Sequence, residues 1–518
     1  MKFRSVFRTL KIFFVLFLIG WMTGCAGHVA KPDPAAPIPL TVLFFNDLHG
    51  HLKPFEVKDE QGGIIETGGI ARMAYLVRGI REENNRNHVR TIVLVAGDIL
   101  QGTPMSTVFR GEPDIKCLNA MGVDAAAVGN HEFDFGLDNF LSLKKQAGFP
   151  FLSANIVEKN GGRLLCDPYL AIDLNEAVSV TIIGVTTREL LTTTKDTNVA
   201  TLDVLDSVGA VRQAYEAVKS RGPVILLSHS RHQTDREIAA AIPGLAAIIG
   251  GHDQILLSPY RLVGNVPVLQ AFEKGRYLGR IDLEIDPVTK MARLIRNSYI
   301  PIVAGMPGDA GIADIVAAYD RRLGDQYKEV IGRADTFLDG ERERIRCEET
   351  ALGNFVTDVM AAYTGADIAL INAGALRASI KQGPVTVEDV FKAMPYANEL
   401  LVTGLTGREI EEMLKRSVSG AREEEDGGFL QVSGIYFDVR GRQVGNVRVG
   451  RDRQPMDAEA RYTVAVPDFL STGGDGYAML KGKSYINTGL PLRELLVDTI
   501  RKQGVIAAGE EGRIRRME

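Results

Sequence analysis

Short runs of apolar residues alternate with stretches of helical periodicity over the first half of the chain. Six runs are apolar enough to predict strands that are buried on both faces, as in a parallel sheet. They span residues 40–45, 91–96, 124–128, 178–185, 224–227 and 246–249. Segments 70–82 and 207–220 lie between some of these runs and carry apolar residues at helical spacing. This alternation predicts an α/β domain in which helices cover a sheet.

From residue 331 onward the pattern changes, which predicts a second domain. Helical spacing recurs at 352–363 and 407–419, and strand-like runs occur at 368–371, 434–440 and 461–467. Residues 312–330 combine helical spacing with many charges, which predicts either a helix that connects the domains or the last helix of the first domain. A chain of 518 residues is also too long for one ordinary core. We therefore expect domains at 39–305 and 331–518, with a connecting helix at 306–330.

The first 25 residues have the pattern of an export signal rather than of a domain. Basic residues precede the apolar run 12–19, which is shorter than the about 20 residues of a spanning helix, so a cleaved signal peptide is favoured over an uncleaved anchor. The pattern resembles a bacterial lipoprotein signal, in which Cys25 is lipidated. Residues 26–38 then form a Pro/Ala tether. We therefore expect an exported protein of the cell envelope or periplasm that is tethered to a membrane.

Composition narrows the class of partner. The net charge is -5, and the basic surplus that is typical of proteins that bind nucleic acid polymers is absent. Single nucleotides remain compatible with this charge, because a metal ion supplies positive charge locally. The cysteines beyond Cys25 form no CxxC pair, so we expect buried thiols instead of disulfides. The acidic run 423–426 is expected to be a solvated loop, and the composition leaves the oligomeric state open.

Polar side chains with metal-binding atoms follow five of the predicted strands. The segments are Asn46-Asp47-Leu48-His49-Gly50, Gly97-Asp98, Gly129-Asn130-His131-Glu132-Phe133-Asp134, Ser228-His229 and Gly250-Gly251-His252-Asp253-Gln254. A polar turn explains any one of them alone. However, four of the eight histidines lie in these segments, which argues against chance. Since ligand sites of open α/β sheets lie beyond the carboxyl ends of the strands, we expect these side chains to converge.

The ligand atoms in these segments indicate a particular class of metal. Carboxylates, an amide oxygen and imidazoles without thiolates suit Zn, Mn, Fe or Co. Two ions about 3.5–4 Å apart need a bridging carboxylate, and Asp98 is the natural bridge because it stands alone after its strand. Asp47 and His49 are two residues apart on an extended segment and point the same way, so they clasp one ion. The sequence therefore predicts two divalent metal ions.

The order of the five segments resembles that of the calcineurin-like metallophosphoesterase superfamily, and the fuller matches at 46–50 and 129–136 resemble its 5′-nucleotidase branch. The resemblance implies a four-layer α/β/β/α sandwich. Its implied ligands are Asp47, His49, Asp98 and Gln254 for one metal, and Asp98, Asn130, His229 and His252 for the other. It also implies that His131 contacts the phosphoryl oxygens and that Asp134 orients His131. His51 and His232 receive no role.

Three segments of the second half resemble the 5′-nucleotidase C-terminal domain. They are Asn372-Ala373-Gly374-Ala375-Leu376-Arg377, Gly428-Phe429-Leu430-Gln431-Val432 and residues 467–477. The resemblance implies an α/β nucleotide-binding domain in which Phe429 and Phe469 sandwich the base and Asp475 accepts from the ribose hydroxyls. It implies that Arg346, Asn372 and Arg377 bind the phosphate. The alternative is that both phenylalanines belong to the core and the glycines to turns.

These features together predict a two-metal phosphohydrolase that converts nucleoside 5′-monophosphates to nucleoside and phosphate. Because the metals and the base contact different domains, we expect a domain rotation during turnover. The same scaffold is compatible with UDP-sugars, dinucleotides or 2′,3′-cyclic nucleotides as substrates. A non-catalytic nucleotide-binding lipoprotein is a further alternative. It would be marked by the loss of a metal ligand, and every implied ligand is present.

Overall fold

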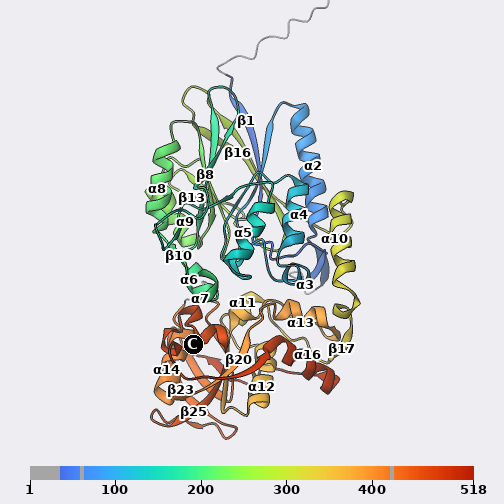
Figure 1. Cartoon of the computed structure of the whole chain (residues 1–518), viewed down its shortest axis with the longest axis vertical. Coiled ribbons are helices and arrows are strands. Elements are labelled where there is room, and N and C mark those ends of the chain that lie inside the picture. Colours follow the sequence, from blue (N-terminus) through green and yellow to red (C-terminus); the bar gives the residue numbers. More distant parts are fainter. Residues whose placement is uncertain (1–35, 59–62, 421–424, 518) are drawn as a thin grey trace, which may run out of the picture.

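Two six-stranded sheets face each other in the N-terminal domain (Figure 1). The computed structural model describes residues 36–58, 63–420 and 425–517, so the predicted signal peptide and nearly all of the tether lie outside the described residues. The first sheet has the order β16 (Ala292–Pro301), β15 (Tyr277–Ile285), β1 (Ile38–Phe45), β4 (Arg90–Val95), β5 (Ala125–Ala127), β6 (Phe151–Leu152). The second has the order β13 (Arg261–Val263), β14 (Val266–Leu269), β12 (Ala247–Gly250), β11 (Val224–His229), β9 (Ser179–Thr186), β8 (Tyr169–Asp173).

Helices cover the outer face of each sheet. The first sheet carries α2 (Ile70–Arg86), α4 (Glu112–Met121) and α5 (Leu137–Gln146), and the second carries α8 (Ser207–Val218) and α9 (His232–Ala241). Successive residues of β1 serve different cores, because side chains alternate across a strand. Val42 and Phe44 enter the core between the sheets, whereas Leu43 and Phe45 pack beneath the helices. This arrangement is the four-layer α/β/β/α sandwich that the resemblance implied.

The predicted strands of the first domain all overlap observed strands, namely β1, β4, β5, β9, β11 and β12. These strands pair in parallel within their sheets and are buried on both faces, which explains their continuous apolar runs. The flanking strands β15 and β16 pair antiparallel, and their burial is partial or alternating. They carry no continuous apolar run, and the pattern did not predict them.

The helix predicted at 312–330 is shorter than expected. Helix α10 spans Ala310–Leu323 and ends at Gly324, whose φ is 82°. Val330 already begins β17 (Val330–Ala334), so the C-terminal part of the prediction was wrong. Ile312 and Tyr319 of α10 belong to the same core as α2 and α4. Helix α10 is therefore the last helix of the first domain, the second of the two alternatives.

The C-terminal domain folds around a single core that includes residues of all its main elements. Its five-stranded sheet has the order β21 (Leu430–Ser433), β18 (Ile368–Asn372), β25 (Arg461–Pro467), β20 (Glu399–Thr406), β26 (Ile486–Pro491). A four-stranded sheet has the order β24 (Gln454–Pro455), β23 (Gln443–Val449), β22 (Ile435–Arg440), β28 (Ile514–Arg516), and a three-stranded sheet the order β19 (Gly383–Thr386), β17, β27 (Val505–Ile506). Its longer helices are α12 (Ala351–Thr364), α13 (Val387–Ala393), α14 (Gly407–Ser417) and α16 (Leu492–Gln503).

Shorter elements complete the described part of the chain. They are β2 (Phe55–Lys58), β3 (Ile64–Thr67), β7 (Ile156–Glu158), β10 (Leu202–Val204), α3 (Pro104–Val108), α6 (Leu190–Thr193), α7 (Asp196–Val199), α11 (Arg342–Ile345) and α15 (Asp468–Ser471), with 3-10 turns at η1 (His131–Phe133), η2 (Asp325–Tyr327), η3 (Ala373–Ala375), η5 (Gly474–Gly476) and η6 (Ala478–Leu480). Among the described residues, no helix combines the length and apolar character that a membrane span requires. Cys117, Cys166 and Cys347 are buried free thiols, as predicted.

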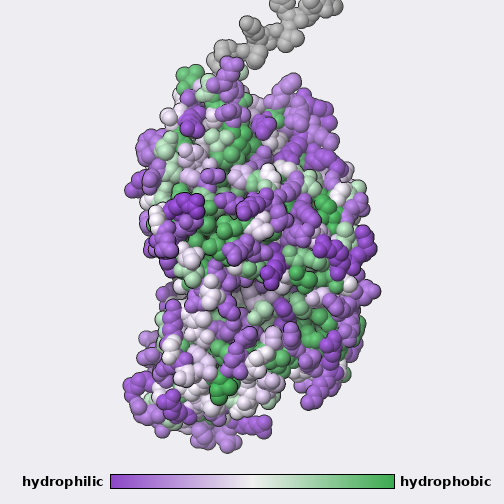
Figure 2. All heavy atoms as spheres, viewed as in Figure 1, coloured by the Kyte–Doolittle hydropathy of each residue, from purple (hydrophilic) through white to green (hydrophobic). Residues whose placement is uncertain are grey.

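The two domains meet at the carboxyl ends of the parallel strands. Helices α6 and α7 extend from the N-terminal domain toward the C-terminal domain (Figure 1), and α6 packs against η5. Lys195 forms an ion pair with Asp468 across this boundary at 2.9 Å. Gln101 donates from its side-chain nitrogen to the carbonyl oxygen of Pro395 at 3.1 Å. Hydrophilic residues cover much of the visible face, and the left edge of the outline is indented where the domains meet (Figure 2).

Candidate active site

The predicted metal ligands lie on tight loops directly after the strands. Most of them have left-handed backbone conformations, which non-glycine residues rarely adopt. Their φ values are 49° at Asp47, 46° at His49, 52° at Asp98, 72° at His252 and 58° at Gln254. Such strain persists only where the surrounding structure enforces it, and it concentrates at functional sites. The sharp turns bring side chains from both sheets to the boundary between the domains.

Asp98 lies at the centre of the cluster. Its Oδ2 atom is 3.1 Å from His229 Nε2 and 3.9 Å from both His49 Nε2 and His131 Nε2. Within the described residues, two groups have ligand atoms close enough to hold a metal ion: His49, Asp98 and His131, and Asp98, His229 and His252. Both groups contain Asp98, which fits a carboxylate that bridges two ions. His51 and His232 lie in neither group.

Asn130 supplies an independent test of the metal site. Its side-chain oxygen is buried, and no hydrogen-bond partner satisfies it. An unpaired buried carbonyl oxygen costs about 1–3 kcal/mol, so native proteins retain one where something else binds it. The donor set around it consists of imidazoles and carboxylates, which suit divalent transition metals. The residues present therefore fit a divalent metal centre.

Burial and charge shape the electrostatics of this cluster. Burial raises the pKa of Asp47 to about 6. Burial also opposes ionisation of Asp98, but His229 and His131 hold the pKa of Asp98 well below its usual value. Burial by itself lowers the pKa of His229, yet the adjacent Asp98 carboxylate raises it to about 10. The cluster thus attracts positive charge, which divalent cations supply when they bind.

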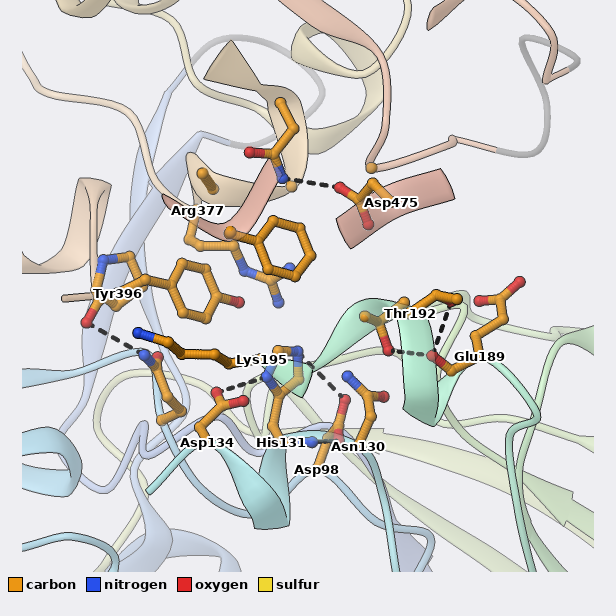
Figure 3. Close-up of a pocket in the computed structure, with 18 of the residues that line it drawn as sticks. Asp98, Asn130, His131, Asp134, Glu189, Thr192, Lys195, Arg377, Tyr396 and Asp475 are labelled. Carbon is orange, nitrogen blue, oxygen red and sulfur yellow. Dashed lines mark hydrogen bonds and ion pairs between the residues drawn. The ribbon is translucent and has the colours of Figure 1, made fainter. Parts of the chain in front are cut away.

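His131 lies against both carboxylates that the resemblance associates with it. Its Nδ1 atom is 2.7 Å from Asp134 Oδ2, and its backbone N–H donates to Asp98 Oδ1 at 3.0 Å. Burial lowers the pKa of His131, but Asp134 and Asp98 more than offset this and raise it above the usual value. The ring is therefore disposed to carry a proton on Nε2, the nitrogen that faces Asp98 and the cavity. Figure 3 shows this imidazole between Asp98 and Asp134.

Glu132, which received no role from the sequence, joins two of the site loops. Its Oε2 atom accepts from the backbone N–H groups of Gly129 at 2.6 Å and Asp98 at 3.1 Å, and its Oε1 atom accepts from Ile99 at 2.7 Å. The side chain is fully buried. Burial raises the pKa of Glu132 to about 7. This carboxylate holds the loop that carries Asp98 against the loop that carries Asn130 and His131.

Arginines of the second domain reach the metal cluster. Arg377 donates to His49 Nε2 at 3.1 Å, and Arg342 donates to Gln254 Oε1 at 2.8 Å. Arg346 is nearly buried, and burial together with Arg342 and Arg377 lowers its pKa well below the usual value. Three guanidinium groups that lie close enough to repel one another, one of them buried, form a site for an anion. Arg342 was missed because the charged stretch around it resembles an ordinary solvated surface.

One cavity of about 560 Å³ connects the metal cluster to the second domain. At one end it is lined by Asp98, Asn130, His252 and Gln254, and at the other by Arg346, Arg377, Phe469 and Asp475. Asn372 lines it as well and donates to Asp475 Oδ2 at 2.8 Å. Burial raises the pKa of Asp475 to about 6.

Phe429 does not lie where the resemblance implied, which was at the cavity wall against the base. Its side chain is 2% exposed, belongs to the core of the second domain and is absent from the cavity lining, whereas Phe469 lines the cavity. In this arrangement the core alternative holds for Phe429. Its stacking role stays a prediction that requires a rearranged loop.

Two further residues of the cavity wall escaped prediction. Tyr396 follows Pro395 in the loop before β20, and its ring stacks on His131 with centroids 5.9 Å apart. Glu189 follows β9 and lies 2.9 Å from His252 Nε2. Asp426 of the acidic run contacts Arg416 at 2.6 Å, so this residue is no free solvated charge. Nothing in the local sequence pattern distinguishes these residues from surface polar positions.

The fold and the site define a metal-dependent phosphoester hydrolase. Residues 40–255 match the family model of calcineurin-like phosphoesterases, and residues 330–482 match that of the 5′-nucleotidase C-terminal domain. The crystal structure of a 5′-nucleotidase precursor from Thermus thermophilus superimposes with a TM-score of 0.84 at 30% identity and covers 93% of this chain and 100% of that one. The chain belongs to the 5′-nucleotidase family.

Curated relatives extend this comparison. The 5′-nucleotidase of Vibrio cholerae is 28% identical over 93% of this chain and 94% of its own length. The trifunctional nucleotide phosphoesterase protein YfkN of Bacillus subtilis is 30% identical over 94% of this chain. This chain spans only 36% of the length of YfkN.

Proposed function

We propose that this enzyme hydrolyses nucleoside 5′-monophosphates to nucleoside and phosphate with two divalent metal ions. The single observation that carries the proposal is the meeting of three groups at one cavity: the proposed metal ligands around Asp98, the His131–Asp134 pair beside them, and arginines from the second domain. Arginine side chains and imidazoles that lie close together suit the binding of a phosphoryl group. The end of the cavity away from the metal cluster has room for a nucleoside. Family membership and the name of the Vibrio relative support the same substrate class.

The metal ligands divide into two sets around Asp98. Asp47, His49 and Gln254 join Asp98 in one set, and Asn130, His229 and His252 join it in the other. When bound, divalent ions supply Lewis-acid chemistry that polarises the phosphoester and acidifies water. His229 donates from Nδ1 to the carbonyl oxygen of Ala96 at 2.8 Å, which turns Nε2 toward Asp98 and the proposed metal site.

The remaining side chains act on the phosphoryl group directly. His131, held by Asp134, donates from Nε2 to a phosphoryl oxygen and stabilises the charge that develops there. Arg346 and Arg377 bind the same group with planar guanidinium forks that match phosphate oxygens. Phe469 stacks on the base and Asp475 accepts from the ribose hydroxyls. Asn372, through its contact with Asp475, extends this polar end of the cavity.

Phosphate release from purified protein tests the proposal. AMP, UDP-glucose and 2′,3′-cyclic AMP are compared by kcat/KM with added Mn²⁺, Zn²⁺ or Co²⁺ and after chelation. The proposal expects AMP to be the best substrate, chelation to abolish release, and added metal to restore it. Equal or greater activity on UDP-glucose or the cyclic nucleotide would replace the proposed substrate.

A broader nucleotide phosphoesterase is the second candidate, and the name of YfkN favours it. The same panel decides between the two, because a broad enzyme gives similar kcat/KM values on several phosphoesters. The first cleavage of UDP-glucose, of a dinucleotide or of 2′,3′-cyclic AMP releases no free phosphate. Those reactions are therefore followed by chromatography of the products.

We further propose that the protein is exported and tethered through a lipidated Cys25. The pattern of residues 1–25 supports this, and the related Thermus protein is described as a precursor. Cell fractionation of the wild type and of Cys25→Ser tests it. The wild type is expected in the membrane fraction, and the variant is expected in the soluble envelope fraction; membrane recovery of both would contradict lipid tethering.

A further inference from the structure

The two ring nitrogens of His252 face different partners. Nδ1 points into the metal cluster, 3.3 Å from His229 Nε2, and Nε2 lies 2.9 Å from Glu189 Oε2. A neutral imidazole binds a metal only through its unprotonated nitrogen, so Nδ1 is available only when Nε2 carries the proton. A carboxylate beside Nε2 selects that tautomer and restrains the ring.

We propose that Glu189 is a positioning residue that orients His252 for metal binding, and that Arg231 holds Glu189 in place. The inference rests on the proposed role of His252 as a ligand. Carboxylates that accept from metal-bound imidazoles typically account for 10–100-fold in metal affinity. His252 has a special need for such support because its backbone is in the left-handed conformation, where neighbouring contacts must hold it.

Arg231 contacts the carboxylate of Glu189 through more than one guanidinium nitrogen. Its Nε atom is 3.1 Å from both carboxylate oxygens, and another guanidinium nitrogen is 3.0 Å from Oε2. Its remaining arm contacts Asp253 at 3.1 Å. Asp253 also accepts from the backbone N–H of His232 at 2.6 Å. A guanidinium in this geometry fixes both the position and the orientation of the carboxylate.

This ion-pair chain links three loops of the second sheet. Glu189 follows β9, Arg231 follows the ligand His229 at the end of β11, and Asp253 stands between the ligands His252 and Gln254 after β12. The loops that carry the proposed imidazole ligands of one metal are therefore held together by ion pairs of the protein itself. Thr192 donates to the carbonyl oxygen of Glu189 at 3.0 Å and fixes its backbone at the start of α6. Figure 3 shows Glu189 and Thr192 together beside the cavity.

Glu189 and Arg231 also line the cavity, so direct substrate binding is the competing role. The contacts favour positioning, because both carboxylate oxygens of Glu189 are occupied by Arg231 and His252. The two roles differ in what they change. A positioning residue alters metal affinity without substrate, whereas a substrate ligand alters KM in enzyme that is saturated with metal.

Metal titration of the apo-protein tests the proposal without substrate. Calorimetry with Mn²⁺ or Zn²⁺ compares the wild type with Glu189→Ala, Glu189→Gln and Arg231→Ala. Glu237→Gln on the exposed face of α9 is the matched control. We expect Glu189→Ala to lower the affinity for one of the two ions by about 10–100-fold and to leave the affinity for the other unchanged. Glu189→Gln keeps one acceptor oxygen, so its affinity for that ion should lie between those of Glu189→Ala and the wild type. Arg231→Ala should lower the affinity for the same ion. The control variant should bind both ions with wild-type affinity.

Wild-type affinity for both ions in Glu189→Ala would overturn the proposal. So would a higher KM at saturating metal with unchanged metal affinity, which would assign Glu189 to the substrate. Thermal unfolding of each apo-variant reports on folding, and Glu189→Gln carries the test where Glu189→Ala fails to fold. Failure of the proposed function is separate: the wild type itself would then bind no ions or release no phosphate.

Discussion

At the scale of single residues, the site works through carboxylates that hold other groups. Asp134 holds the His131 ring, Glu132 holds backbone N–H groups of two loops, and Asp98 lies between the two ligand clusters. Asp98 and Glu132 are buried and Asp134 is partly buried, so their partners are close and poorly screened by water. The consequence is that small changes in these side chains have separable effects on chemistry and on stability.

His131→Ala is expected to lower kcat on AMP by about 10²–10³-fold, because one preorganised donor to the phosphoryl oxygen is lost. Asp134→Asn should have a smaller effect in the same direction, since the ring remains but loses its charged partner. Bound metal, measured by atomic emission, should stay at wild-type content in both variants. Near-wild-type kcat in His131→Ala would remove His131 from the mechanism.

Glu132→Gln is expected to destabilise the N-terminal domain by about 1–3 kcal/mol. The amide retains one acceptor oxygen and turns its NH₂ group toward a backbone N–H that needs an acceptor. Thermal unfolding of metal-free protein measures the loss, and Asn139→Ala on the surface of α5 serves as a mild control. An unchanged unfolding midpoint would show that the three hydrogen bonds carry little of the loop's stability.

At the scale of elements, the parallel strands bring the site loops to one edge of the domain, and these loops orient the functional side chains. β1, β4 and β5 of one sheet and β9, β11 and β12 of the other all end at the same boundary. The first turns of these loops are left-handed at several ligands, which redirects side chains that would otherwise follow the strand. The site also requires the backbones of neighbouring loops to lie close together, which glycines allow because they have no Cβ atom.

Gly129→Ala tests this close approach. A Cβ at this position would overlap the Asp98 side chain and backbone and crowd Glu132 at 2.7 Å. We expect loss of metal binding and a fall in kcat of at least about 10²-fold, because a misplacement of 1 Å at a site costs that much. Gly79→Ala in α2 is the control. It has nothing within 4 Å and should be neutral or stabilise by about 0.5–1 kcal/mol.

At the scale of the whole molecule, the active site exists only while the domains are together. Arg377 reaches His49, Arg342 reaches Gln254 and Tyr396 stacks on His131, and each of these contacts crosses the boundary. The cavity is lined by both domains, and the predicted domain rotation would let a nucleotide enter and its products leave. The Lys195–Asp468 pair marks a place where that movement can be blocked.

A reducible thiol cross-linker between Lys195→Cys and Asp468→Cys is expected to abolish steady-state turnover. Reduction should restore it. The native cysteines among the described residues are buried, and burial raises the pKa of Cys166 to about 11, so they compete little for the reagent. The Lys195→Cys single variant, treated identically, should keep its activity. Full turnover by the cross-linked protein would show that domain movement is unnecessary.

Much of this molecule was determined by local sequence pattern. Continuous apolar runs identify strands that are buried on both faces, and a polar residue at the end of such a strand must lie at the edge of the sheet. The place of His49, Asp98, His229 and His252 at the ends of strands was therefore predictable, because it depends only on neighbours along the chain. The four-layer fold and the division of the ligands between two metals came instead from the resemblance of the five segments to a known family.

Tertiary structure alone decided the contacts between distant segments. Glu189 and Arg231 stand 42 residues apart, and Gln254 and Arg342 stand 88 apart. In sequence, each is a charged or polar residue with no periodicity to mark it. Phe429 shows the converse, because its motif suggested a cavity wall and packing placed it in the core. Strand order and domain contact, which bury such residues or bring them together, are properties of the whole chain.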